Sequence, residues 1–137
     1  MADWQECLKK RIVKEIQEDK GLIISLLKSS KNKQDSQQQL HLSEITSGSK
    51  ISLAYDALRE LLEALALQQG FKIYNHECYT AFLKEVLNKS DWGDEFDQIR
   101  KVRNSINYYG QEISPEEAKG IIREIERLQL RINSLLR

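Results

Sequence analysis

The sequence predicts an all-α protein, specifically an up-and-down four-helix bundle with one additional N-terminal helix. Composition is the first reason. The 137 residues include one proline and six glycines, whereas Leu, Glu, Lys, Gln and Ala are abundant, and this composition favours helices. Apolar residues also recur at intervals of three and four in several stretches, as in amphipathic helices. Short connections join these stretches and favour antiparallel neighbours.

We expect one domain over residues 1–137, with a helical extension at 1–19 and the bundle at 20–137. A chain of this length buries roughly 65–70% of its unfolded surface, so it needs no disulfide or metal to complete its core. The extension is predicted from a helical stripe formed by Trp4, Leu8, Ile12 and Ile16. Asp19-Lys20-Gly21 interrupts this stripe, and Leu22 begins the second helical segment.

The stretch Lys28–Gln39 contains no apolar residue. Its residues favour a helix weakly, but without an apolar stripe little would hold such a helix against a core. A continuing helix with a solvated face, a frayed helix end and a loop therefore all remain open. Residues Glu44–Lys50, with Ser47-Gly48-Ser49, are expected to separate this segment from the next helix.

The stretch Ile51–Gln69 is the strongest core helix, because its apolar spacing has no gap. Gly70 should end it, and a six-residue connection follows. Asn75 can cap the next helix. The apolar stripe of that helix is Tyr79, Phe82, Leu83, Val86 and Leu87, and Asn88–Gly93 is expected to be a turn.

The stretch Glu95–Gly110 carries the candidate site. Its apolar face is Phe96, Ile99, Val102, Ile106 and Tyr109, and a polar row of Arg100, Arg103, Asn104 and Asn107 runs beside it. Arg103 and Asn107 lie about 40° apart on a helix, at the margin between core and water. Gly110 fits a left-handed C-terminal cap. The last helix should begin at Ser114-Pro115-Glu116-Glu117, which forms a capping box with proline at the first helical position.

Charge and cysteine content limit the function classes. Twenty-one basic and twenty-one acidic residues cancel, so binding to nucleic acid or membrane would need a local patch. Cys7 and Cys78 lie far apart without ligand-like spacing. We interpret them as free thiols, which fits a cytoplasmic protein, and a disulfide is the alternative. We expect no signal peptide and no transmembrane segment, because the apolar runs are short and the N-terminus is charged.

The sequence lacks the usual metal and phosphate motifs. His41 and His76 are the only histidines, and neither has a metal-binding companion. No Gly-rich phosphate loop is present, and no serine is tied to a histidine as in a nucleophilic triad. We therefore expect neither a metal nor a cofactor. His76 would lie in a helical first turn on the side of Tyr79, where a packed or hydrogen-bonded imidazole is the simplest interpretation.

The octet Arg103-Asn104-Ser105-Ile106-Asn107-Tyr108-Tyr109-Gly110 resembles the end of a helix in prokaryotic HEPN domains, especially archaeal ones. Tyr55-Asp56-Ala57-Leu58-Arg59-Glu60 with the following run to Gly70 resembles their second helix. Asn75-His76-Glu77-Cys78 resembles the histidine-led start of their third helix. The resemblance covers about residues 20–137. It implies a four-helix bundle that pairs as a homodimer and brings two motifs together in a cleft. Many members are metal-independent RNases, often toxins encoded beside a minimal nucleotidyltransferase.

The chain departs from this family at the catalytic histidine. The family motif is an arginine followed a few residues later by histidine. Arg103 matches the arginine and Asn104 the next polar residue, but Tyr108 stands where the histidine is commonest. Histidine exchanges protons near neutral pH, whereas tyrosine has an unperturbed pKa of about 10. Losing general acid–base help costs a factor of about 10²–10⁴.

Three hypotheses follow. In the first, Arg100, Arg103, Asn104, Asn107 and His76 bind a nucleotide, RNA or a partner protein without efficient catalysis. In the second, the protein is an RNase that uses Arg103 with Tyr108, Asn107 or His76. In the third, it is a helical interaction module whose arginines are structural, with Arg103 paired to Asp56, Glu60 or Glu63. The expected partners are a second copy of the chain, RNA or a nucleotide, and a nucleotidyltransferase-type antitoxin.

Overall fold

The computed structural model describes residues 3–137 and is predominantly helical, which confirms the predicted class. Within residues 3–137, no helix is long and apolar enough to cross a membrane. The helices are α1 (Trp4–Lys9), α2 (Lys20–Gln39), α3 (Ser47–Gln68), α4 (His76–Ala81), α5 (Ser90–Tyr109) and α6 (Pro115–Asn133). A π-helical turn, η1 (Phe82–Val86), extends α4, and two short strands are β1 (Val13–Glu15) and β2 (Phe71–Ile73).

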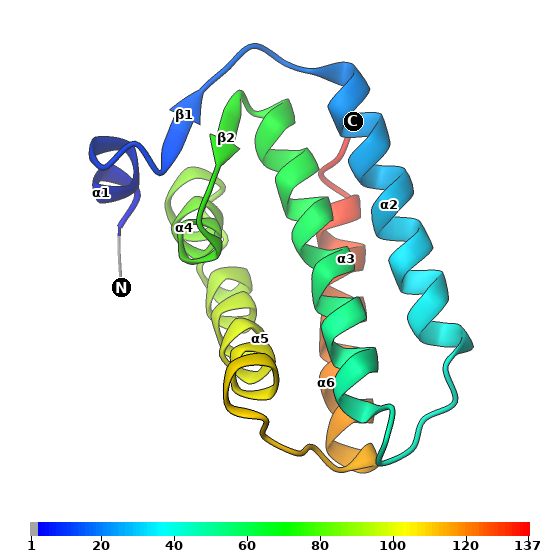
Figure 1. Cartoon of the computed structure of the whole chain (residues 1–137). Coiled ribbons are helices and arrows are strands. Elements are labelled where there is room, and N and C mark those ends of the chain that lie inside the picture. Colours follow the sequence, from blue (N-terminus) through cyan, green and yellow to red (C-terminus); the bar gives the residue numbers. More distant parts are fainter. Residues whose placement is uncertain (1–2) are drawn as a thin grey trace.

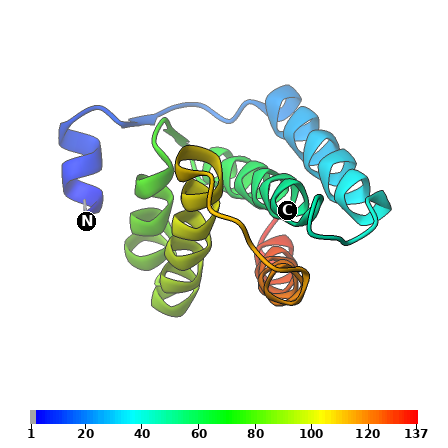
Figure 2. The same ribbon diagram turned by 60° about the horizontal axis from the view of Figure 1, so that its bottom comes forward.

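The central helix is α3, which is flanked by α2, α5 and α6 (Figure 1). In that view α2 and α3 run in opposite directions, whereas α3 and α6 run the same way. The turned view shows α4 and α5 side by side on one side of α3, with α2 on the other (Figure 2). Fully buried side chains of α3 lie along most of its length: Ile51, Tyr55, Leu58, Leu62, Leu65 and Leu67. The helix with the unbroken apolar pattern is therefore the core of the fold.

The polar stretch Lys28–Gln39 is helical, which confirms the continuing helix in the first of its three interpretations. Polar contacts replace the missing apolar stripe. Ser30 is buried and donates a hydrogen bond to the Ala57 carbonyl at 2.6 Å. Lys33 forms an ion pair with the buried Glu60. The interpretation as a solvated face therefore fails for the side that packs on α3.

The end of α2 is capped from α3. Lys50 is buried, and its Nζ donates hydrogen bonds to the carbonyls of Gln37 and Leu40, the latter at 2.8 Å. Carbonyls at a helix C-terminus have no partner within the helix, and a cation favours the negative end of the helix dipole. The predicted break over Glu44–Lys50 was too long, because α3 begins at Ser47 and Lys50 already lies in its first turn.

The helical stripe predicted for the N-terminal extension is wrong beyond Lys9. The chain leaves α1 through Arg11, which has a positive φ of 60°. The N–H of Ile12 bonds to the carbonyl of Cys7 at 3.0 Å, and that of Arg11 to the carbonyl of Leu8 at 3.1 Å. This is the bonding pattern of a Schellman motif, which usually contains glycine. Because arginine takes that position here, no glycine in the sequence marks the end of α1.

After this turn the chain forms β1, which pairs antiparallel with β2. The register places buried Val13 opposite buried Ile73. The predicted loop after Gly70 is therefore largely a strand. It could not be recognised from either segment alone, because each strand has only three residues and is completed by the other.

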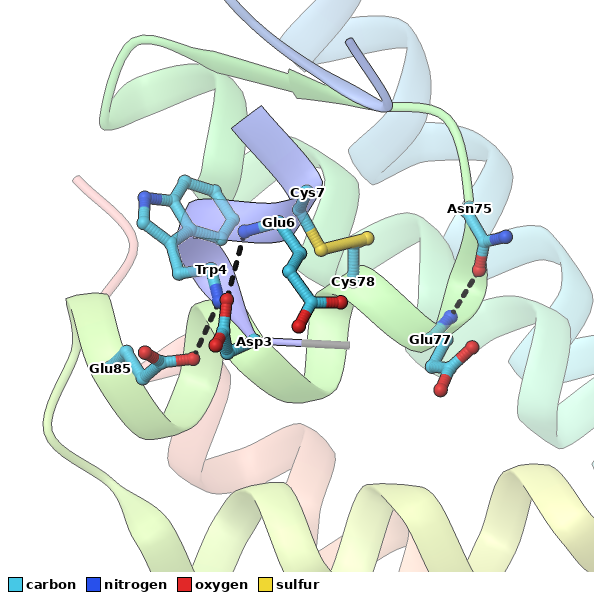
Figure 3. The surroundings of a disulfide bond; sticks show 8 residues. All are labelled: Asp3, Trp4, Glu6, Cys7, Asn75, Glu77, Cys78 and Glu85. Atoms are coloured by element: carbon cyan, nitrogen blue, oxygen red, sulfur yellow. Dashed lines mark hydrogen bonds between the residues drawn. A yellow bond between two sulfur atoms is a disulfide. The ribbon is translucent and has the colours of Figure 1, made fainter. Parts of the chain in front are cut away.

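The prediction of free thiols is wrong, because Cys7 and Cys78 form a disulfide (Figure 3). The bond joins α1 to α4 across 71 positions of the sequence, and both cysteines are buried. Trp4 reinforces the same junction: its backbone N–H donates to Glu85 at 2.7 Å, and its ring lies edge-on to Phe71. Chain spacing did not reveal the pairing, which depends on the β1–β2 ribbon. The inference of a reducing cytoplasm from free thiols loses its premise.

The predicted turn Asn88–Gly93 is shorter than expected, because α5 begins at Ser90. Gly93 lies inside the helix and serves close packing rather than a turn. A Cβ at this position would lie 2.5 Å from Cγ of Lys84 and 3.2 Å from the Thr80 carbonyl oxygen. Glycine therefore lets α5 approach α4 and η1 closely.

The ends of the last two helices largely follow the prediction. Gly110 has a φ of 64° and caps α5 in the left-handed conformation. The Ser114 side chain accepts from the Glu117 N–H, and Pro115 opens α6. The apolar face predicted for α5 is wrong at its last turn, because Tyr109 is 84% exposed.

Candidate functional site

The candidate site lies where α3, α4 and α5 meet, and Tyr55 is at its centre. Tyr55 is fully buried and its ring stacks on Phe96, with centroids 5.8 Å apart. Its hydroxyl lies 2.9 Å from Nδ1 of His76 on α4. The Arg103 guanidinium carbon, on α5, lies 5.2 Å from the centroid of the same ring. One buried side chain therefore contacts both the arginine and the histidine that the sequence had indicated.

Local capping places His76. Asn75 precedes α4 in an extended conformation, and its side chain accepts from the Glu77 N–H at 2.7 Å (Figure 3). The cap predicted at Asn75 is thus confirmed. It starts the helix at His76, and the disulfide at Cys78 holds the same turn from the other side. The hydrogen bond to Tyr55 agrees with the simple interpretation of a packed and locally bonded imidazole.

Three arginines surround this position, and each has a carboxylate partner. Arg59 bonds to Glu63 at 3.0 Å, and Arg100 bonds to Asp97 at 2.8 Å. Two lysines share these carboxylates, Lys72 with Glu63 at 2.8 Å and Lys101 with Asp97 at 3.1 Å. The remaining pair is Arg103 with Asp56. The cations therefore outnumber the carboxylates with which they are paired.

The contact of Arg103 with Asp56 is the loosest of the three arginine pairs. The N–O distance is 3.7 Å, which is too long for a hydrogen bond. The Arg103 side chain is 16% exposed, and its buried Nε has no hydrogen-bond partner among residues 3–137. Nε of Arg100 is in the same state. Arg100 is held by its bond to Asp97 and Arg103 by its packing on Tyr55, and in both guanidinium groups Nε remains an unused donor.

The cluster also changes proton affinities. The pKa of His76 is lowered to about 4, first by burial and then by the nearby cations Arg59 and Arg103. Burial raises the pKa of the Tyr55 hydroxyl well above its usual value. Burial would also raise the pKa of Asp97, but hydrogen bonds from Arg100 and Lys101 outweigh it and lower the pKa. At neutral pH the site therefore contains an uncharged imidazole, a protonated phenol and ionised Asp97.

The rest of the predicted row follows α5 away from Tyr55. Asn104 is half-buried, and Asn107 is exposed and accepts a hydrogen bond from Ser52 at 3.0 Å. Tyr108 is 70% exposed and shares no hydrogen bond or ring contact with Arg103 in the described chain. The structure thus groups Arg100, Arg103 and His76, and leaves Tyr108 outside the group.

Sequence reasoning missed two members of the cluster. Tyr55 was assigned to the core stripe, and nothing in one sequence distinguishes a buried tyrosine from one that also bonds to a histidine. Arg59 was not considered for the site, although it lies one helical turn beyond Tyr55 on α3. Of the carboxylates expected near Arg103, Asp56 is its partner, whereas Glu60 pairs with Lys33 and Glu63 with Arg59.

Among residues 3–137, no three His, Cys, Asp or Glu side chains are grouped as a metal ion would require. No family model matches the chain, and no curated protein matches it significantly. The chemistry available at the site is therefore that of guanidinium donors, one imidazole and buried phenols. Such a set can hold an anion by charge-assisted hydrogen bonds.

Proposed function

We propose that the protein binds phosphate groups of RNA or a nucleotide at the cluster of Arg103, Arg100 and His76, without cleaving RNA efficiently. The observation that carries the proposal is the state of Arg103. Its guanidinium is fixed over the ring of Tyr55, yet its carboxylate contact is 3.7 Å long. A phosphate oxygen offers shorter charge-assisted hydrogen bonds than this contact provides.

Electrostatics support an anionic ligand. The pKa of His76 is lowered partly because several arginines repel a proton at this position, and the same positive potential attracts phosphate. The planar fork of arginine matches two phosphate oxygens. Asn104 and Asn107 extend the row toward the end of α5 and offer further amide donors.

The same geometry argues against efficient cleavage. Cleavage without a metal requires one group to remove the 2′-hydroxyl proton and another to protonate the leaving oxygen. His76, with a pKa of about 4, carries almost no proton to donate at neutral pH. Tyr108 is exposed on the last turn of α5 and, in the described chain, shares no hydrogen bond or ring contact with Arg103. No pair of groups here suits both proton transfers.

The proposal extends to the type of fold. The order of long helices and the motif on α5 support a HEPN-like four-helix bundle formed by α2, α3, α5 and α6, preceded by α1. On this proposal the chain pairs as a homodimer. A nucleotidyltransferase-type protein is then a candidate second partner. These points rest on the resemblance of residues 103–110 and of the segments around Tyr55 and His76.

The third hypothesis, in which Arg103 is only structural, is favoured by one observation, the Asp56 contact itself. If that ion pair were the whole role of Arg103, removing either partner should destabilise the fold similarly and alter no binding. The two roles can therefore be separated by substituting Asp56.

The experiment measures binding of a fluorescent single-stranded RNA in EDTA, by anisotropy, for the wild type and three variants. We expect Arg103→Ala to weaken binding at least about tenfold, the scale of one charged hydrogen bond. Asp56→Asn should bind as well as the wild type or better, because it frees the guanidinium. Arg123→Ala is the matched control, since Arg123 is exposed on α6 and has no ion pair among residues 3–137. Affinity should fall as salt rises.

Two results would overturn the proposal. If the wild type binds neither RNA nor AMP, and Arg103→Ala and Asp56→Asn are equally destabilised in urea, the arginine is structural. If the wild type cleaves the RNA in EDTA and Arg103→Ala does not, the protein is a metal-independent RNase.

A further inference from the structure

We propose that Tyr55 is a positioning residue that fixes the imidazole of His76 with its hydrogen on Nε2, so that His76 offers the ligand a hydrogen-bond donor and not a base. The role of Tyr55 follows from the structure of the free protein. The role of His76 toward phosphate rests on the proposed function.

The direction of the Tyr55–His76 hydrogen bond follows from the partners available to the Tyr55 hydroxyl. Its side chain is fully buried, and the described chain provides its hydroxyl with one partner, Nδ1 of His76 at 2.9 Å. If Nδ1 carried the hydrogen it would donate to the phenolic oxygen, and the phenol hydrogen would have no acceptor. A buried donor without a partner costs about 1–3 kcal/mol. The phenol therefore donates to Nδ1, whose lone pair accepts.

The surroundings of the His76 imidazole determine its charge. The groups that act on His76 are Arg59 and Arg103, more weakly Arg100, the carboxylate of Asp56, and the rings of Tyr55 and Tyr79. The cations outnumber the carboxylate, and the ring is partly buried, so the uncharged form is favoured. A neutral imidazole whose Nδ1 accepts a hydrogen bond carries its single hydrogen on Nε2.

A ligand must also be able to reach Nε2 of His76. Nε2 of His76 makes no hydrogen bond in the described chain. It is also not one of the polar atoms that are fully buried without a hydrogen-bond partner. It is therefore not fully buried, and His76 as a whole is half-buried. The Tyr55 ring contacts the Arg103 guanidinium at 5.2 Å and the His76 ring at 5.7 Å, measured to centroids. The residue that fixes the tautomer of the histidine thus also supports the arginine.

This arrangement adds a reason why the site should bind and not cut. A general base needs a free nitrogen lone pair, and the lone pair of His76 is directed at the phenol of Tyr55. The other nitrogen, Nε2, carries a hydrogen, which a phosphate oxygen can accept. The hydrogen bond from Tyr55 therefore makes His76 a hydrogen-bond donor toward the ligand and not a general base.

The first test is nitrogen-15 NMR of the His76 ring at pH 7 in the free protein. The wild type should show the form with hydrogen on Nε2, and Tyr55→Phe, which removes only the hydroxyl, should show a mixture of both forms. His41, which is exposed and has no side-chain hydrogen bond in residues 3–137, is the internal control. A wild-type ring with its hydrogen on Nδ1, or one unchanged in Tyr55→Phe, would overturn the positioning role.

The second test is AMP binding by calorimetry. Tyr55→Phe should weaken binding several-fold. His76→Gln should retain most affinity, because the glutamine amide offers an N–H near the place of Nε2, whereas His76→Ala should lose it. Equal losses in the glutamine and alanine variants would overturn the donor role. If wild-type protein binds no AMP or RNA, the proposed function and the donor role fail together. The NMR result on Tyr55 still decides the positioning role in that case.

Discussion

The two sides of α3 use buried polar groups differently. Toward α2, Ser30, Lys33 and Lys50 each contact a partner on the neighbouring helix, and Lys50 donates to two carbonyls. Toward α5, Arg103 lies over Tyr55 with a loose carboxylate contact, and its Nε has no partner. Among residues 3–137, the α2 side leaves two acceptors without a partner, Oε1 of Gln37 and Oε2 of Glu60, whereas the α5 side leaves donors without a partner, Nε of Arg100 and of Arg103, near His76.

This contrast shows that burial of a charged side chain does not by itself indicate a functional site. Lys50 is as buried as a core residue, and its contacts explain it completely as the cap of α2. Arg103 is less buried, and its contacts do not explain its position completely. Four changes, each confined to one side of α3, test this contrast, and the change with the largest expected effect comes first.

Removing the disulfide should have the largest effect, because it anchors α4, which carries His76. A disulfide that closes a loop of this length contributes about 4 kcal/mol by restricting the unfolded chain. We expect dithiothreitol to lower the free energy of unfolding in urea by about that amount, while the Cys7→Ser/Cys78→Ser double variant should not respond to it. An identical urea midpoint with and without reductant would show that the bond contributes nothing.

Lys50→Met tests the α2 side. Two carbonyls at the end of α2 lose a charged donor, and hydrogen bonds to charged groups contribute about 1.5–3 kcal/mol. We expect the free energy of unfolding to fall by about 3 kcal/mol while RNA affinity stays unchanged. Lys28→Met, at an exposed position of α2, should change stability by less than about 0.5 kcal/mol. Loss of RNA binding in folded Lys50→Met would contradict the separation of the two sides.

Gly93→Ala tests the packing of α4 and η1 against α5. The added methyl group meets Lys84 and the Thr80 carbonyl, and overpacking costs about 1–3 kcal/mol. Gly120→Ala is the matched control, because a Cβ there meets nothing within 4 Å. It should stabilise α6 by about 0.5–1 kcal/mol. Thermal unfolding of both variants checks the pair, and a stabilised Gly93→Ala would show that the close approach is not needed.

The fourth effect concerns pH. The pKa of His76 is about 4 in the folded chain, against about 6.5 in an unfolded one. The unfolded chain therefore binds the proton first, so this contribution to stability is complete above about pH 6.5 and is lost as pH falls toward 4. The urea midpoint of the wild type should fall more than that of His76→Gln over this range. Parallel pH profiles would mean that the histidine is not perturbed.

The sequence predicted those elements whose signals are local. The unbroken apolar spacing of α3, the serine cap followed by proline at Ser114 and the glycine cap at Gly110 each depend on neighbouring residues, and each was confirmed. The β1–β2 ribbon and the Cys7–Cys78 bond depend on segments distant in the chain. The left-handed turn at Arg11, which ends α1, uses a residue that rarely marks such a turn. These features were therefore missed.

For the site, periodicity identified Arg100 and Arg103 at the margin of α5, and the resemblance pointed to His76. The sequence could not show that Tyr55 contacts both Arg103 and His76. Tyr55 belongs to the core pattern of α3, and its second role arises only when α4 brings His76 to its hydroxyl. The pairing of Arg103 with Asp56 instead of Glu60 or Glu63 was equally out of reach, because it depends on the relative rotation of α3 and α5.

The most direct test of phosphate binding at this cluster is the NMR titration of His76 with and without AMP. A bound phosphate is an anion beside the imidazole and stabilises its charged form. We therefore expect saturating AMP to raise the pKa of His76 from about 4, and Arg103→Ala to abolish the rise. A His76 titration that AMP does not move would contradict the central claim.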